Sequence, residues 1–174
     1  MQRYLTFVVL FISISATKAQ EVTERSSPLA LARARYKDAY IKITYSQPAK
    51  NGREIFGKLV PYGQIWRTGA NEATEILLTK NILINNQLLK AGVYTIFTIP
   101  NKDKWTVVIN SDFGLFGSYN YNPKLDVFRF DVPVQQLNVV YEPLTIQIDQ
   151  RNELANILIM WDNVSIAIPI KFFN

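Results

Sequence analysis

The chain has 174 residues and a formal net charge of +5, and it contains no histidine and no cysteine. The lack of histidine excludes a Ser-His-Asp triad and imidazole acid–base catalysis, and the lack of both residue types excludes ordinary zinc, iron and copper sites. No metal or cofactor is therefore expected. Basic residues are spread along the chain and resemble no nucleic-acid-binding motif, so no nucleic-acid partner is expected either.

Residues 1–19 have the pattern of an export signal. Arg3 precedes an apolar run over residues 4–14, and small residues lead to a cleavage site after Ala19. A retained membrane anchor is the alternative, which is disfavoured because the run is short and no stop-transfer pattern follows. The mature chain would begin at Gln20 and have no transmembrane span. Since no cysteine is available to carry a lipid, we expect an exported protein, periplasmic or extracellular, that is not a lipoprotein.

The rest of the chain is dominated by short β-strand patterns. Residues 20–38 are interpreted as an N-terminal tether or the first edge of the fold, ahead of a β domain over residues 39–174. Asn85 and Asn86 suit the positive φ of a tight hairpin turn, and Pro169 indicates an edge position in the last strand. The predicted strands are residues 40–45, 74–80, 82–84, 87–89, 93–99, 104–109, 127–132, 144–149, 157–161 and 164–172, with a turn at 162–163.

Short strands separated by turn signals, without a long helical period, are typical of a β-sandwich or a small barrel. Residues 156–161 place apolar side chains on both faces, as a core strand of a sandwich does. We therefore predict an all-β fold, an antiparallel β-sandwich of about nine strands with a jelly-roll-like form. The predicted core includes Ile96, Phe97, Val107, Ile146, Ile148, Ile157, Ile159, Ile166 and Ile168.

Residues 50–75 differ from the rest of the chain. Four glycines, one proline and three aromatic residues occur here together with several charges, and neither a strand nor a helix period is present. Irregular segments on a regular scaffold often carry the function. Within this segment Trp66 could stack on a flat ligand face, while Arg67, Asn71 and Glu72 offer directional hydrogen bonds. The alternative is structural: Trp66 fills the core, and Arg67 pairs with Glu72 or Glu54 to hold the loop.

A second aromatic stretch, Tyr119-Asn120-Tyr121, suits carbohydrate or peptide recognition if it is extended, because alternate residues then share one side. Packing over the end of the fold is the alternative. Glu72, Glu75, Asp112 and Asp126 could supply the carboxylate pair that a glycoside hydrolase needs. The candidate ligand-binding residues are Arg53, Tyr62, Trp66, Arg67, Asn71, Glu72, Tyr119 and Tyr121, and no catalytic residue is assigned.

Several motifs together resemble one family of secreted bacterial proteins, common in Bacteroidota, the domain of unknown function 2911 family. The most specific is the run Trp66-Arg67-Thr68-Gly69-Ala70-Asn71-Glu72-Ala73-Thr74. The others are Tyr45-Ser46-Gln47-Pro48, the stretches 50–57 and 59–63, Ala91-Gly92-Val93-Tyr94, Trp105-Thr106-Val107 and the stretch 118–122. The resemblance runs from about Ser27 to Phe172. It implies export, one domain and an all-β fold, and it implies no substrate.

These patterns give three functional hypotheses. The first is a ligand-binding protein, with a small molecule or a glycan bound at a loop-rich end of the fold. The second is a carboxylate-dependent hydrolase on the same scaffold, and the third is a structural interaction module of the cell envelope. A pocket lined by Trp66, Arg67 and Glu72 would favour the first, and two facing carboxylates would favour the second. A flat apolar patch would favour the third.

Overall fold

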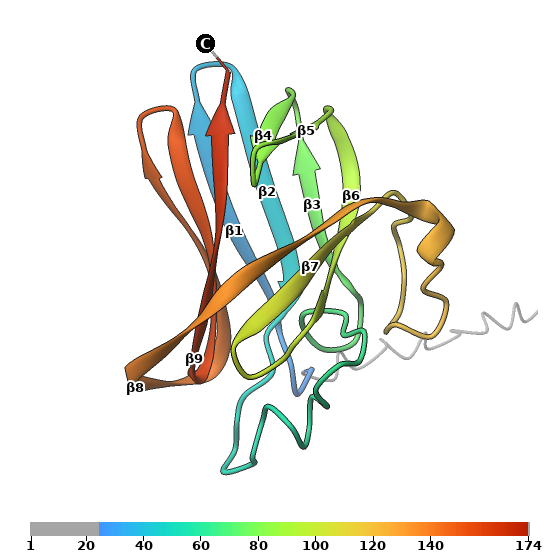
Figure 1. The fold of residues 1–174 in the computed structure, drawn as a ribbon, viewed down its shortest axis with the longest axis vertical. Helices are drawn as coiled ribbons and strands as arrows, with labels where there is room; N and C mark the ends of the chain where they lie inside the picture. Colours follow the sequence, from blue (N-terminus) through green and yellow to red (C-terminus); the bar gives the residue numbers. More distant parts are fainter. Residues whose placement is uncertain (1–24, 174) are drawn as a thin grey trace, which may run out of the picture.

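The computed structural model describes residues 25–173, so the predicted signal peptide and the expected start at Gln20 lie outside the described residues. The described part is all-β, with nine strands and one short 3₁₀ turn at Pro123–Leu125 (Figure 1). The strands are β1 (Leu29–Tyr36), β2 (Ala39–Ser46), β3 (Thr74–Leu78), β4 (Ile82–Ile84), β5 (Gln87–Leu89), β6 (Gly92–Ile99), β7 (Lys104–Asn110), β8 (Asp126–Arg151) and β9 (Leu154–Phe172). Within residues 25–173, no helix is long and apolar enough to cross a membrane.

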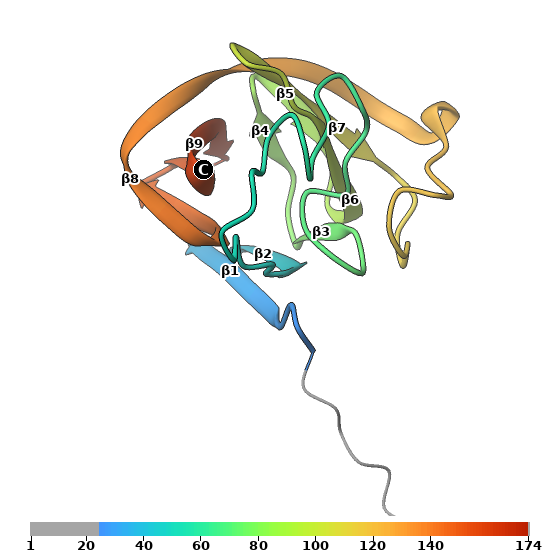
Figure 2. The ribbon, with the colours of Figure 1, turned by 90° about the horizontal axis from the view of Figure 1, so that it is seen from below.

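All nine strands join one antiparallel sheet in the order β1-β2-β3-β6-β7-β8-β9-β4-β5. The sheet curls around the interior without closing (Figure 2). Strand β8 joins its two halves, because residues 126–133 pair with β7 and residues 134–151 pair with β9. The predicted all-β antiparallel class is thus confirmed, and the bent β8 is compatible with a sandwich.

Two long strands replace four predicted short ones. Residues 127–132 and 144–149 belong to the single strand β8, and residues 157–161 and 164–172 belong to β9. The predicted turn at 162–163 is wrong. Asp162 does have a positive φ of 56°, but it pairs with Tyr141 at an irregularity inside the β8–β9 ladder. The turn signal therefore marks a local bend within a continuous strand pair.

The sheet edges fit two of the three sequence signals. Strand β1 is an edge strand paired with β2, inside the stretch predicted as a tether or edge. Strands β4 and β5 form the predicted hairpin, and Asn85 and Asn86 at its turn have φ values of 46° and 62°. Such values match a two-residue turn of the type that asparagine tolerates. The edge position predicted for the last strand from Pro169 is wrong, because β9 lies between β8 and β4; Pro169 is tolerated there because it lies beyond Ile166, where the pairing with β8 ends.

The core lies inside the curl of the sheet. Eight of the nine predicted core residues are buried, and Ile148 is partly buried and packed against the cluster. On β9, Ile166, Ile168, Ile170 and Phe172 are all buried at alternate positions, as the sequence period requires. Burial of this continuous apolar face stabilises the fold without disulfides.

Residues 47–73 leave the strands and cover one end of the curled sheet, below the strands in Figure 1 and across the open end in Figure 2. Ile55 and Val60 from this segment are buried in the main core. A bridge between Ala49 and Pro143 fixes the start of the segment to β8, and a bridge between Trp66 and Thr98 fixes its later part to β6. The irregular segment predicted from the sequence is therefore a well-anchored cap. We call it the end cap.

Candidate functional site

The end cap is held to the sheet by main-chain hydrogen bonds. The amide of Lys50 donates to the carbonyl of Glu142 over 2.7 Å, and Trp66 and Thr98 exchange amide–carbonyl bonds of 2.8 and 2.9 Å. The amide of Gly63 donates to the carbonyl of Pro100 over 2.9 Å. These bonds fix the backbone, so side chains of the cap have defined positions.

The turn over residues 66–74 is braced by buried polar groups. The indole Nε1 of Trp66 donates to the carbonyl of Gly69 over 3.1 Å, and the Thr74 hydroxyl donates to the carbonyl of Thr68 over 2.8 Å. The hydroxyls of Thr68 and Thr98 lie 3.0 Å apart and are hydrogen-bonded. Thr68, Thr74 and Thr98 are fully buried, so these bonds are shielded from water. Thr68 adopts a left-handed φ of 56°, which this network supports.

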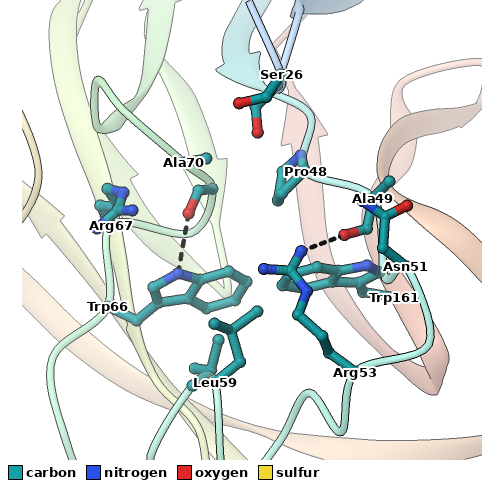
Figure 3. Close-up of a pocket in the computed structure, with 13 residues that line it drawn as sticks. Ser26, Pro48, Ala49, Asn51, Arg53, Leu59, Trp66, Arg67, Ala70 and Trp161 are labelled. Carbon is teal, nitrogen blue, oxygen red and sulfur yellow. Dashed lines mark hydrogen bonds between the residues drawn. The ribbon is translucent and has the colours of Figure 1, made fainter.

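A pocket of about 290 Å³ opens between this turn and the first part of the end cap (Figure 3). We call it the end pocket. This volume is close to the lower limit of about 300–1,000 Å³ that is usual for small-ligand sites. Its lining residues are Ser26, Ser27, Pro48, Ala49, Asn51, Arg53, Leu59, Val60, Trp66, Arg67, Gly69, Ala70 and Trp161.

Trp66 and Trp161, which line the end pocket, belong to an aromatic cluster. The rings of Trp66 and Trp161 are 5.9 Å apart and nearly parallel, at 17°. Trp105 packs against Trp66 at 5.9 Å, and Phe56 lies 5.0 Å from Trp105. Trp66 is only 8% exposed. It therefore fills the core, as the structural alternative expected, and also forms part of the pocket wall.

Arg53 lies across the end pocket from Trp66 (Figure 3). Its Nε donates to the carbonyl of Lys50 over 3.0 Å and its Nη2 donates to the carbonyl of Ala49 over 2.5 Å. These two bonds fix the plane of the guanidinium and leave Nη1 without a partner among residues 25–173. Arg53 is thus a positioned hydrogen-bond donor at the pocket.

Arg67 also lines the end pocket, but its side chain lies on the far side of Trp66 from Arg53 (Figure 3). Its Nε is buried and has no hydrogen-bond partner within residues 25–173. Glu72 is not its partner. The Glu72 carboxylate accepts bonds of 2.8 and 2.9 Å from Arg25 and one of 3.2 Å from the Ser46 hydroxyl. The alternative in which Arg67 pairs with Glu72 or Glu54 to hold the loop is therefore wrong, because Arg67 forms an ion pair with neither residue among residues 25–173.

Glu72 and Asn71 lie outside the end pocket. With Arg25, Ser26 and Phe116 they form a shallower depression of about 250 Å³, which adjoins the end pocket at Ser26. The pKa of Glu72 is lowered, first by its own backbone amide and then by Arg25 and Ser46, against the opposing effect of partial desolvation. An ionised carboxylate is expected here at neutral pH.

The predicted tyrosines lie elsewhere. Tyr62 lines a separate pocket with Phe56 and Asn101, and its ring covers Gly57, whose φ is +92°. Tyr119 is 85% exposed.

Tyr121 instead packs against Phe97 at 4.9 Å and donates to Asp126 over 2.7 Å. Burial, followed by the neighbouring Asp126 carboxylate, raises the pKa of Tyr121 to about 12. Tyr119 and Tyr121 do not share a side, because this stretch is a turn and not a strand.

The candidate carboxylates do not meet in the end pocket, whose lining contains neither Asp nor Glu. Glu75 accepts a bond of 2.7 Å from the amide of Gly114. Asp126 accepts bonds from Tyr121, Asn110 and Arg129, and Asp112 accepts the amide of Phe113. Each of these carboxylates has a local structural partner.

Sequence reasoning missed much of the pocket wall. Asn51, Leu59, Gly69 and Ala70 lie inside the segment that was singled out, so their position along the chain was a usable signal. Trp161 gave no such signal, since it ends a run of core residues on β9 and reaches the pocket only through the fold.

Comparison with known proteins gives one relationship. No curated protein and no solved structure matches the sequence. The family described as "Protein of unknown function (DUF2911)" matches residues 27–170, which contain every strand except the last residues of β9. The match covers most of the chain, including the end cap and all residues of the end pocket except Ser26. The chain therefore belongs to the DUF2911 family.

Proposed function

We propose that the protein binds a carbohydrate in the end pocket. The observation that carries this proposal is the pairing of an aromatic wall, formed by Trp66 and Trp161, with a rim of polar groups, among which Arg53 is fixed by hydrogen bonds. Binding sites for small molecules combine a largely apolar surface with a few placed donors and acceptors. Sugars present the same two kinds of surface, C–H faces and hydroxyl groups.

The rim provides partners for hydroxyl groups. Asn51 offers an amide donor and acceptor, Ser26 and Ser27 offer hydroxyls, and Arg53 offers donors. The exposed side chain of Leu59 adds apolar surface beside Trp66 (Figure 3). The anchored end cap carries Asn51, Arg53 and Leu59 on a backbone that is fixed before any ligand arrives, which lowers the entropic cost of binding.

Binding is favoured over hydrolysis. Glycosidases usually place two carboxyl groups about 5–9.5 Å apart on either side of the scissile bond. The lining of the end pocket contains no carboxylate, and the candidate carboxylates nearby are engaged in structural hydrogen bonds. The end pocket therefore lacks the pair of carboxylates that the hydrolase hypothesis requires.

Tryptophan fluorescence offers a direct test, because all three tryptophans of the chain belong to the aromatic cluster. Titration of residues 20–174 with a panel of oligosaccharides should change the emission saturably for at least one of them. Ala70→Phe should fill the end pocket and weaken binding by at least about 10-fold, the equivalent of about 1.4 kcal/mol. Ala91→Phe is the matched control, because Ala91 is exposed and does not line this pocket. Equal affinity of Ala70→Phe and Ala91→Phe would overturn the site.

A second function is favoured by a separate feature, the loop that joins β7 and β8. Phe113 and Phe116 are each 61% exposed there, and Tyr119 is still more exposed. The amide of Ala73 donates to the carbonyl of Leu115 over 2.8 Å, which holds the loop in place. We propose that these aromatic side chains serve an interaction module that contacts another envelope component. The double variant Phe113→Ser/Phe116→Ser should then lose co-sedimentation with envelope material and keep its affinity for glycans. Retained co-sedimentation would count against the interaction module.

The proposal includes export to the periplasm or the medium, on the basis of the N-terminal sequence pattern. N-terminal sequencing of the protein from culture fractions should begin at Gln20. A chain that retains Met1 would overturn this part.

A further inference from the structure

The end pocket is positively charged. Its two ionic lining residues are Arg53 and Arg67, and no Asp or Glu lines it. Neutral sugars are usually held by a mixture of donors and acceptors, whereas this wall is rich in donors and poor in charged acceptors. The positive charge of the lining therefore favours a ligand that carries negative charge.

Two other cations near the end pocket, Lys50 and Arg25, are neutralised by carboxylates. Lys50 pairs with Asp162 at 2.5 Å, and both side chains are about four-fifths buried. Arg25 pairs with Glu72 at 2.8 Å. Among residues 25–173, neither Arg53 nor Arg67 has an acidic partner. The end pocket thus retains the charge of both lining arginines, whereas the charges of Lys50 and Arg25 beside it are neutralised.

Arg53 is arranged to receive an anion. The carbonyls of Lys50 and Ala49 fix its Nε and Nη2 but do not cancel its charge. A guanidinium has five N–H donors, so Nη1 and one hydrogen of Nη2 remain for a ligand. A carboxylate fits two such donors at once, and a fixed guanidinium loses little side-chain entropy on binding it.

We infer that the ligand of the end pocket is an acidic oligosaccharide whose carboxylate pairs with Arg53. This inference rests on the proposed carbohydrate-binding function and narrows it to uronic-acid-containing glycans. The sugar ring lies toward the wall formed by Trp66 and Leu59. The charge of Arg67 at the far side of Trp66 strengthens the positive potential of the pocket.

The test compares a galacturonate trimer with its fully methyl-esterified form, which keeps the sugar and removes the charge. Residues 20–174 are titrated with each by tryptophan fluorescence at low salt, with a neutral cello-oligosaccharide and inorganic phosphate as further probes. The acidic trimer should bind at least 10-fold more tightly than its ester, and its affinity should fall as salt rises, because salt screens exposed charge.

Three variants test whether the carboxylate of the ligand binds Arg53. Arg53→Gln should weaken binding of the acidic trimer at least 10-fold, and Arg53→Lys should retain part of the affinity. Lys58→Gln removes the same charge from the same end cap at an exposed position outside the pocket lining, and it should change affinity less than 2-fold. Circular dichroism and melting curves establish that each variant is folded.

The outcomes separate the two levels of the proposal. Equal binding of the acid and its ester, or binding of the neutral glycan alone, would overturn the acidic-ligand inference and leave carbohydrate binding standing. Equal losses in Arg53→Gln and Lys58→Gln would overturn the role of Arg53. Binding of phosphate as tight as that of the acidic trimer would overturn the inference, because the pocket would then recognise anions without the sugar. Failure of every glycan to bind would overturn both the inference and the proposed function.

Discussion

Thr74→Val is the sharpest test of how the end pocket is built. The Thr74 hydroxyl donates to the carbonyl of Thr68 over 2.8 Å, and both residues are fully buried. Valine has nearly the same shape but replaces this donor with a methyl group. The carbonyl of Thr68 then loses its bond in a place that water does not reach.

The expected loss follows from this geometry. Leaving a buried carbonyl without a partner costs about 1–3 kcal/mol. A methyl group is also too large to lie 2.8 Å from a carbonyl oxygen, so the turn must shift, which adds to the loss. For a domain of this size, each kcal/mol lowers Tm by about 2–4 °C. We therefore expect Tm to fall by about 2–12 °C.

Thr106→Val is the matched control. The Thr106 hydroxyl donates to Asp131 over 2.6 Å, but the Asp131 side chain is 44% exposed, so water can replace the lost donor. Its cost should stay within about 1 kcal/mol. Urea unfolding followed by circular dichroism measures both variants. A loss in Thr74→Val no greater than that in Thr106→Val would refute the view that a buried hydrogen-bond network holds the pocket wall.

Three further predictions concern other parts of the fold. Ile168→Ala removes a fully buried side chain from β9 and should cost about 2–5 kcal/mol in urea unfolding; a cost below 1 kcal/mol would contradict the core assignment. The losses of stability in Arg67→Ala and Glu72→Ala should add up in the double variant to within about 0.5 kcal/mol, because the two side chains do not bond to each other. A larger deviation from additivity in urea unfolding would mean that the two positions interact. The pKa of Tyr121 is raised to about 12, so between pH 10 and 12 the native state keeps a proton that the unfolded chain releases, and stability falls as pH rises. Tyr121→Phe should make that fall shallower and should remove one high-pH step from the absorbance titration at 295 nm; an unchanged slope would count against the raised pKa.

The sequence by itself determined the fold class. Period-two alternation, as at Ile166, Ile168 and Ile170, predicts which face of a strand is buried, because successive side chains point to opposite faces. Local turn chemistry was also readable, and Asn85-Asn86 forms the predicted hairpin. The end cap was located because its glycines and charges interrupt the strand period.

Only the tertiary structure decided the lengths of β8 and β9 and the composition of the end pocket. Asp162 resembles a turn residue, yet long-range pairing with Tyr141 keeps it inside a continuous ladder. Trp66 and Trp161 are far apart in the chain and become neighbours only because the end cap folds back over β9. Glu72 pairs with Arg25, and Arg67 stays without an acidic partner among the described residues. Such pairings depend on distances that chain position does not encode, since they arise from how the whole sheet curls.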